Sequence, residues 1–211
     1  MLSILSSVLF ISCDKMKNSQ QEKSKQVDYT NVQEKDFSEL FVEIQPDQIE
    51  GSPFSILSKN FTVVTSGLAD SFNSMVIGEG MLGGSSRKLA TTMRMRGNGY
   101  TLEKILETQT YTLTIFDERF KEQFILFGQS SGRDSNKMKE TTLTPVTTPS
   151  GKFTYKEAYL VIECTLAETY TINLDEVYNE ENHKFYEDAY KSVGLYHKVV
   201  VGDITNVWIR K

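Results

Sequence analysis

The sequence predicts a mainly β domain, a β-barrel with short helices, and three observations lead to this prediction. Segments with the composition or alternation of strands clearly outnumber segments with helical periodicity. The helical segments are short insertions and do not alternate regularly with strands, as βα units would require. No internal repeat is evident. This pattern indicates a barrel or sandwich with helical decoration.

The first part of the expected domain consists of strands that end in turns. β-branched residues predict a strand at 61–65, and a second strand is expected at 73–77. A third strand is expected at 88–96, where neighbouring threonines favour β structure. Residues 78–84 are rich in glycine, and we interpret them as a loop between the second and third strands.

Helical signals begin after the third strand. Asn98-Gly99 is a turn signal, and Thr101 can cap a short helix that follows it. Residues 111–116 alternate in the manner of a half-buried strand. Three phenylalanines then recur at helical spacing, and they predict an amphipathic helix over 118–127.

The last part of the chain returns to β structure. A short helix is expected over 134–140, capped by Asp134 or Ser135. Long strands are expected at 157–170 and at 197–209. Strands therefore dominate both ends of the expected domain.

Composition excludes several classes of protein. The mean hydropathy of −0.34 excludes an integral membrane protein. The net charge of −5 is spread along the chain, whereas a nucleic-acid surface needs a clustered basic excess. No pair among Cys13, Cys164, His183 and His197 has zinc-ligand spacing, so we expect no metal site. Cys164 lies in an apolar run and is interpreted as a small buried hydrophobic residue.

The N-terminal residues have the pattern of a leader. Residues 2–11 form an apolar run that is shorter than the roughly 20 residues of a transmembrane helix and fits a secretory signal. Residues 10–13 resemble a bacterial lipobox, whose cysteine, here Cys13, is lipidated. No Lys or Arg precedes the run, so either translation starts upstream or the segment is an ordinary buried one. We interpret residues 1–13 as the leader.

Residues 14–36 read as a flexible polar tether, because their few apolar residues cannot repay the entropy of ordering. The folded domain is expected to cover 37–211, with Pro46 and Pro53 near its start. A lipid anchor at Cys13 would make the protein a lipoprotein of the cell envelope, either periplasmic or at the surface. The anchor would then be the protein's only contact with the membrane. Without a functional signal the protein would be cytoplasmic.

Two short motifs are rejected because their structural context is wrong. Residues 78–83 match the dinucleotide pattern G-x-G-x-x-G, but that fingerprint requires a helix to begin within it. More glycine follows here, and glycine disfavours a helix by about 1 kcal/mol per residue. Residues 128–132 match G-x-S-x-G, but a nucleophile elbow requires a buried strand before it. The preceding residues have helical periodicity, so a hydrolase is not expected.

Three other segments carry a recognisable pattern. The first joins a strand ending in Thr65-Ser66 to Asn73-Ser74-Met75 in the next strand. The second runs from Arg96 to Tyr100-Thr101, and the third runs Ser131-Gly132-Arg133-Asp134 and continues to Lys137. Together they resemble the flavin reductase-like family of FMN-binding split barrels, over roughly residues 54–209. The fold that this resemblance implies is a Greek-key split β-barrel.

The resemblance implies FMN as cofactor and assigns roles to these segments. The first would line the isoalloxazine ring, where backbone amides and small hydroxyl groups can donate hydrogen bonds to the flavin. In the second, the Arg96 guanidinium would bind the phosphate beside N–H groups at a helix start. Family members carry a further basic residue where Gly99 stands, and Arg94, two residues from Arg96, can substitute for it. The alternative is that both arginines are solvated side chains on an edge strand.

The third segment is the most specific of the three. Relatives place this loop and helix start near the cofactor and the subunit interface. Asp134 alone could be a helix cap, but capping does not explain Gly132, Arg133 and Lys137 together. His197 precedes Gly202-Asp203 at the spacing that relatives show for a histidine on the substrate or donor side, although Asp203 replaces their Glu.

The resemblance implies electron or hydride transfer through FMN, with no side chain needed as nucleophile or acid. The protein is then an NAD(P)H-dependent flavin reductase or a flavoredoxin-like carrier that uses a redox protein as partner. A location outside the cytoplasm favours the carrier, because NAD(P)H is scarce there. A homodimer with FMN near the interface is expected, since one barrel would leave apolar strand faces uncovered. The alternative is a split-barrel binding module that has lost its cofactor.

Overall fold

The computed structural model describes residues 34–57, 61–69, 71–129, 131–133, 137 and 140–211. The strands are β1 (Phe41–Ile44), β2 (Phe61–Ser66), β3 (Asn73–Val76), β4 (Gly80–Ser85), β5 (Lys88–Met95), β6 (Thr110–Phe116), β7 (Pro145–Thr147), β8 (Phe153–Tyr155), β9 (Leu160–Thr171) and β10 (Lys198–Arg210). The helices are α1 (Glu34–Leu40), α2 (Pro53–Ile56), α3 (Tyr100–Thr108), α4 (Lys121–Gln129) and α5 (Glu180–Val193). Short 3₁₀ turns are η1 (Pro46–Gln48), η2 (Glu118–Phe120) and η4 (Leu174–Glu176).

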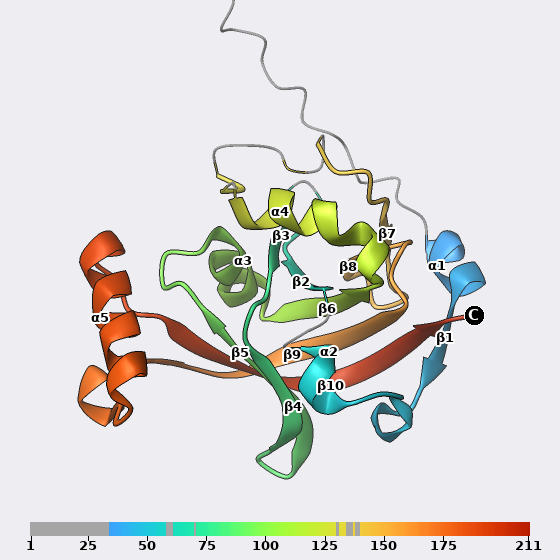
Figure 1. Ribbon diagram of the computed structural model, residues 1–211. Coiled ribbons are helices and arrows are strands. Elements are labelled where there is room, and N and C mark those ends of the chain that lie inside the picture. Colours follow the sequence, from blue (N-terminus) through green and yellow to red (C-terminus); the bar gives the residue numbers. More distant parts are fainter. Residues whose placement is uncertain (1–33, 58–60, 70, 130, 134–136, 138–139) are drawn as a thin grey trace, which may run out of the picture.

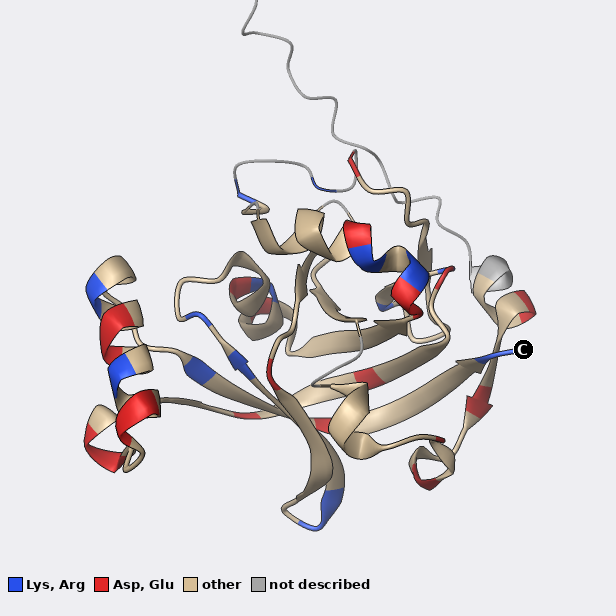
Figure 2. Cartoon of the chain, viewed as in Figure 1, with Lys and Arg blue, Asp and Glu red and all other residues tan. Residues whose placement is uncertain are grey.

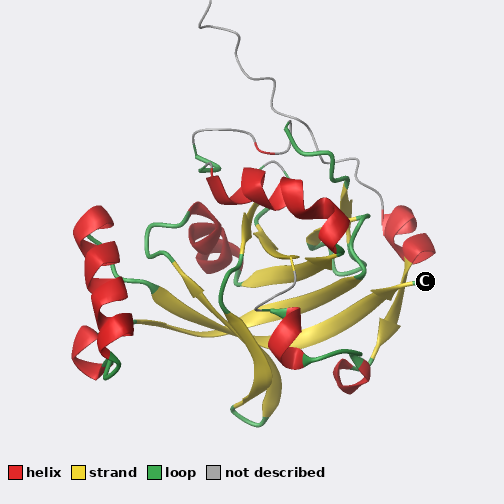
Figure 3. Cartoon of the chain, viewed as in Figure 1, coloured by secondary structure: helices red, strands yellow, loops and turns green. Residues whose placement is uncertain are grey.

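A curved antiparallel sheet forms the body of the molecule (Figure 1). Its strand order is β3-β2-β6-β9-β10-β5-β4, and β1 pairs with β10 beside this path. The helices lie at the periphery of the sheet, and α5 projects away from it at the far end of β9 and β10 (Figure 3). The predicted mainly β barrel with short helices is confirmed.

Most of the predicted elements are confirmed within a few residues. β2, β3, β5 and β6 correspond to the strands expected in the first half of the chain, and β9 and β10 to the two long ones. The helix expected over 118–127 is present as η2 followed by α4. Of the helix expected over 134–140, only residues 137 and 140 are described, so this prediction is not tested.

The glycine-rich loop expected over 78–84 is wrong, because β4 forms a hairpin with β5 there. Ser86 and Arg87 connect the two strands, and both have positive φ angles of 48° and 69°. Asn-Gly usually marks a two-residue turn of this kind, and Ser86-Arg87 does not carry that mark. β4 therefore forms because it pairs with β5, although its glycines have poor strand propensity.

Two further corrections concern helices. Thr101 is not the cap of α3, because Gly99 occupies the N-cap position and Thr101 is the second helical residue. The longest helix, α5, was not predicted. Its ends nevertheless carry ordinary signals: the Asn179 side chain accepts from the Asn182 N–H, and Gly194 ends the helix at a φ of 71°. The short strands β1, β7 and β8 were also not predicted.

The two largest apolar clusters of the described residues stabilise the sheet. One fills the inside of the curved sheet and includes Leu113, Ile162 and the buried Cys164, whose interpretation as a core residue is confirmed. Burial raises the pKa of the Cys164 thiol to about 12. The second core lies between the sheet and the helices α1 and α4, where the fully buried Phe37 packs edge-on against Trp208. α1 begins three residues before the predicted domain start at 37.

The described residues contain neither a membrane-spanning helix nor a cluster of metal ligands. None of the helices in this part of the chain has the length and apolar character to cross a membrane. Within the same residues, no three His, Cys, Asp or Glu side chains gather as a metal ion would require. Basic and acidic side chains are interspersed along α5, whereas those of α4 lie at its N-terminal end (Figure 2).

Candidate functional site

A cavity of about 710 Å³ opens where β3, the start of α3 and the C-terminal end of α4 meet. This volume lies in the range of small-molecule and cofactor sites. The lining residues are Asn73, Met75, Val76, Arg96, Asn98, Gly99, Tyr100, Thr101, Phe127, Gly128, Gln129, Ser131, Gly132, Arg133 and Lys137. The cavity therefore unites residues from all three segments of the predicted site.

The wall of the cavity is held together by direct contacts between these segments. The Asn73 side-chain amide donates to the Thr101 hydroxyl at 2.7 Å, which joins β3 to α3. Gly132 packs against the same asparagine: a Cβ atom there would lie 2.0 Å from Asn73 Oδ1 and 3.0 Å from Tyr100 Cδ1. Any larger residue would force Asn73 to move, so the third segment packs closely on the first two.

The N-terminus of α3 forms one end of the cavity. Gly99, at the N-cap, offers no side-chain hydrogen bond to the N–H groups of the first turn. Helix N-termini with free N–H groups attract anions. Gly99 has no side chain that could cap these N–H groups, and Gly99, Tyr100 and Thr101 all line the cavity.

The two candidate arginines occupy different places. Arg96 is exposed at the cavity, and within the described part of the chain no carboxylate lies at ion-pair distance from it. Arg94 instead pairs with Glu79 at 3.2 Å and lies 6.0 Å from the centre of the Tyr186 ring. It lines a separate cavity beside α5. β5 ends at Met95, so the shared strand face expected for the two arginines stops short of Arg96.

The Arg133 side chain makes its contacts with neighbouring residues of the chain. Its guanidinium donates to the Asn98 carbonyl at 2.9 Å, forms an ion pair with Glu103, and lies 5.3 Å from the centre of the Tyr100 ring. Lys104 lies at the same distance from that ring. Arg133 thus fastens the third segment to the α3 end of the cavity, and Ser131 accepts from its backbone N–H at 3.2 Å.

Lys137 lies on the β3 and α4 side of the cavity and is only 5% exposed. Its ammonium donates to the Phe127 carbonyl at 2.9 Å and approaches the Ser74 carbonyl at 3.5 Å. Burial lowers the pKa of this lysine. The cavity is therefore lined by an exposed cation, Arg96, and a buried one, Lys137.

Three predicted residues lie behind the cavity wall. Thr65 and Ser74 share a hydroxyl contact of 2.8 Å, and Ser74 also contacts the Tyr155 hydroxyl at 2.5 Å. Ser66 donates to the Thr110 carbonyl at 2.7 Å. These hydroxyl groups are buried, and their hydrogen bonds connect strands of the fold. Asp134 lies outside the described residues.

His197 lines a neighbouring cavity of about 380 Å³ together with Arg96 and residues of α5. Its ring lies 5.5 Å from Tyr186, and its Nδ1 atom is buried without a hydrogen-bond partner in the described part of the structure. Arg96 therefore lies between the two cavities. Because α5 was not predicted from the sequence, this wall of the neighbouring cavity was not predicted either.

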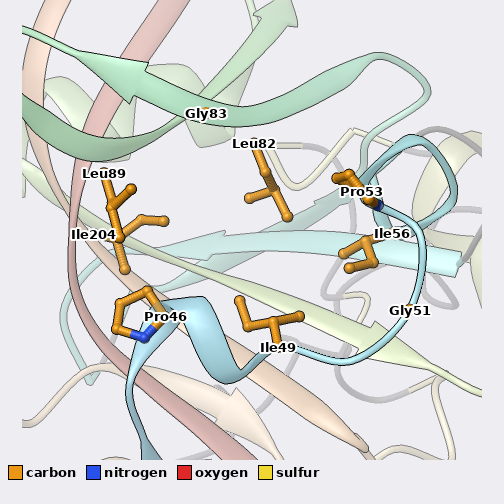
Figure 4. A pocket seen from close by; sticks show the side chains of 9 residues that line it. All are labelled: Pro46, Ile49, Gly51, Pro53, Ile56, Leu82, Gly83, Leu89 and Ile204. Carbon is orange, nitrogen blue, oxygen red and sulfur yellow. The ribbon is translucent and has the colours of Figure 1, made fainter.

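A further cavity, of about 240 Å³, has a different character. Figure 4 shows its side chains converging from the 46–56 segment, from β4 and β5, and from Ile204 of β10. All of the side chains that line it are apolar. Because it offers no charged or polar side chain to a phosphate, it is not a candidate for the flavin.

Several solved structures share the split-barrel fold, which defines the structural class of this chain. An FMN-binding domain of a flavin reductases-like enzyme from Shewanella baltica OS155 matches with a TM-score of 0.58 and 11% identity, over 80% of this chain and 76% of that one. An FMN-binding protein from Thermus thermophilus matches with a TM-score of 0.56 and 15% identity, over 79% of this chain and 80% of that one. Flavoredoxin from Methanosarcina acetivorans matches with a TM-score of 0.53 and 16% identity, over 78% of this chain and 75% of that one.

The family follows from the sequence comparison. The model of the flavin reductase like domain matches residues 54–211, so the chain belongs to this family. No curated protein matches the sequence. The family and the fold predicted from the three segments are both confirmed.

Proposed function

We propose that this domain binds FMN in the 710 Å³ cavity and transfers electrons through it. One observation carries the proposal: three segments separated in the sequence meet around a single cavity that is lined by cationic side chains and by the N-terminus of α3. The residues fit such a ligand, because Arg96 and the N-terminus of α3 can hold a phosphate. Asn73 and Met75 of β3 would face the ring, and Gly132 leaves room for the close packing of the wall.

Bound FMN would supply the redox chemistry by accepting a hydride or electrons. The chain's own residues would bind and orient it. Arg96 fixes the phosphate, the Asn73–Thr101 hydrogen bond holds β3 against α3, and Arg133 keeps the third segment closed over both. His197, beside Arg96, would line the approach of a donor or acceptor.

Two further features belong to the proposal. The protein would form a homodimer with FMN near the interface. Tyr178, just before α5, is 90% exposed, and Phe185, on α5, is 54% exposed, so a second chain would cover apolar surface there. Residues 1–13 would direct it to the cell envelope, with lipid at Cys13. Light scattering tests the first, and mass spectrometry of the membrane fraction tests the second. A stable monomer with FMN bound, or an unmodified N-terminus, would contradict them in turn.

The test of electron transfer is the visible spectrum of the purified protein before and after anaerobic NADH or NADPH. A yellow protein that either nucleotide bleaches is a flavin reductase. A yellow protein that only a chemical reductant bleaches supports the flavoredoxin-like carrier, which uses a redox protein as donor. A colourless protein that takes up no added FMN contradicts the proposal and leaves the binding module without cofactor.

A further inference from the structure

Lys137 differs from the other buried lysines of the described chain. Lys104 is 8% exposed and pairs with Glu107, and the mostly buried Lys152 pairs with Glu163. Lys137 is 5% exposed, and no carboxylate among the described residues lies at ion-pair distance from it. An unpaired buried charge is unfavourable, so a partner that arrives later would explain its position.

A purely structural role explains only part of this arrangement. The Phe127 carbonyl belongs to the last turn of α4, and a lysine there is a common helix C-cap. The second acceptor, the Ser74 carbonyl, is distant at 3.5 Å. An ammonium group has three donors, so at least one remains for another acceptor. A cap also has no need to be buried at the wall of a cavity.

The position of Lys137 selects which part of a ligand it meets. Arg96 and the N-terminus of α3 lie at the end of the cavity that suits a phosphate. Lys137 is held between β3 and α4, and its acceptor Ser74 stands between the cavity residues Asn73 and Met75. The ring of a ligand whose phosphate is at Arg96 would therefore lie against β3, beside Lys137.

We infer that Lys137 is the cation that faces the flavin ring and stabilises its reduced, negatively charged form, which raises the reduction potential. This inference rests on the proposed function. Uptake of two electrons and one proton by the ring leaves one net negative charge on it, and Lys137 keeps its own proton throughout. A positive charge near the ring nitrogens is one of the ways in which proteins tune a flavin.

The experiment measures the reduction potential of FMN bound to the full chain by anaerobic spectroelectrochemical titration. Lys137→Met removes the charge and keeps the length of the side chain, whereas Lys137→Gln removes the charge and keeps a hydrogen-bond donor. Lys121→Met is the matched control, since Lys121 is an exposed lysine at the other end of α4 and does not line the cavity. The Kd of oxidised FMN is measured for each variant.

Both Lys137 variants should lose about tenfold in affinity for reduced relative to oxidised FMN, which lowers the potential by about 30 mV for a two-electron couple. Lys121→Met should keep the wild-type potential. If Lys137→Met does not fold, Lys137→Gln carries the test. An unchanged potential in the Lys137 variants, or an equal fall in the control, overturns the inference while FMN binding stands. Failure of the wild type to bind FMN contradicts the proposed function itself.

Discussion

Asn73 of β3 and Thr101 of α3 are 28 residues apart and share a buried side-chain hydrogen bond of 2.7 Å. This bond joins the ring side of the proposed FMN site to its phosphate side. Gly132 packs directly on Asn73, so the third segment depends on the same contact. The three segments therefore form one unit, and a change in any of them should affect both binding and stability.

Gly132→Ala tests this packing. The new Cβ would lie 2.0 Å from Asn73 Oδ1, so the asparagine must move and its bond to Thr101 is strained or lost. The free energy of unfolding should fall by about 1–3 kcal/mol, the usual range for overpacking. FMN affinity should fall by about tenfold, which corresponds to about 1.4 kcal/mol.

Gly128→Ala is the matched control for stability, because a Cβ there meets no atom within 4 Å and the residue is helical. Alanine should raise the stability of α4 by up to about 1 kcal/mol. Urea denaturation of both variants, followed by FMN titration of the Gly132 variant, decides the matter. Equal stability of the two variants would show that Gly132 is not packed as described.

Arg96→Ala should weaken FMN binding by about ten- to a hundredfold, because a charge-assisted hydrogen bond contributes about 1.5–3 kcal/mol. Riboflavin, which has no phosphate, should bind wild type and variant almost equally. Arg94→Ala should have little effect on either flavin, since Arg94 is paired with Glu79 outside the cavity. Fluorescence titration of both flavins with both variants measures this. A larger loss for Arg94→Ala would reverse the ranking.

Residue types in the three segments predicted which stretches of the chain line the cavity, but they did not predict which side chains in those stretches face it. Asn73 and Met75 face the cavity, whereas Ser74 between them points to the other side of β3, as the two-residue period of a strand requires. Applying that period would have excluded Ser74 in advance. The same period misled for Arg94 and Arg96, because β5 ends between them and a strand end depends on tertiary pairing.

Other parts of the fold could not be predicted from local sequence patterns, because they depend on tertiary pairing. β4 is rich in glycine, and only its partner strand makes it a strand. The position of the α5 wall beside Arg96 and His197 depends on how β9 and β10 extend from the body of the sheet. By contrast, the caps of α5, Asn179 and Gly194, were readable and could have revealed that helix.

Lys152→Met should destabilise the domain strongly. Glu163 is fully buried, and its carboxylate accepts from Lys152 Nζ at 2.7 Å and from Trp208 Nε1 at 2.7 Å. Removal of the lysine leaves a buried charge without its partner, which lowers the free energy of unfolding by about 3–5 kcal/mol.

The control for this prediction is Lys88→Met, which breaks the more exposed pair with Asp203 and should change stability by about 0–1 kcal/mol. Urea denaturation measures both variants under the same conditions. Similar midpoints for the two variants would mean that the Lys152–Glu163 pair contributes no more than a surface ion pair.

His197 should make stability depend on pH. Burial, together with the charges of Arg96 and Arg94, lowers the pKa of His197 below its ordinary 6.5, while Glu79 acts in the opposite direction. The unfolded chain therefore takes up this proton first as the pH falls. The contribution of neutral His197 is fully present above about pH 6.5 and is lost as the pH falls toward the lower folded-state pKa.

His197→Gln should remove this loss, so the difference in melting temperature between wild type and variant should narrow or reverse as the pH falls below about 6.5. Thermal melts from about pH 5 to pH 8 measure the difference, since histidine titrates in this range. A constant difference across the range would show that the folded and unfolded chains protonate His197 alike.

The central claim is that the cavity between β3, α3 and α4 holds FMN. Calorimetric titration of the purified, flavin-free protein with FMN tests it most directly, with Arg96→Ala measured alongside. The predicted result is saturable binding of about one FMN per chain, weakened by about ten- to a hundredfold in the variant. No binding to the wild type, or binding that the Arg96 change leaves untouched, would contradict it.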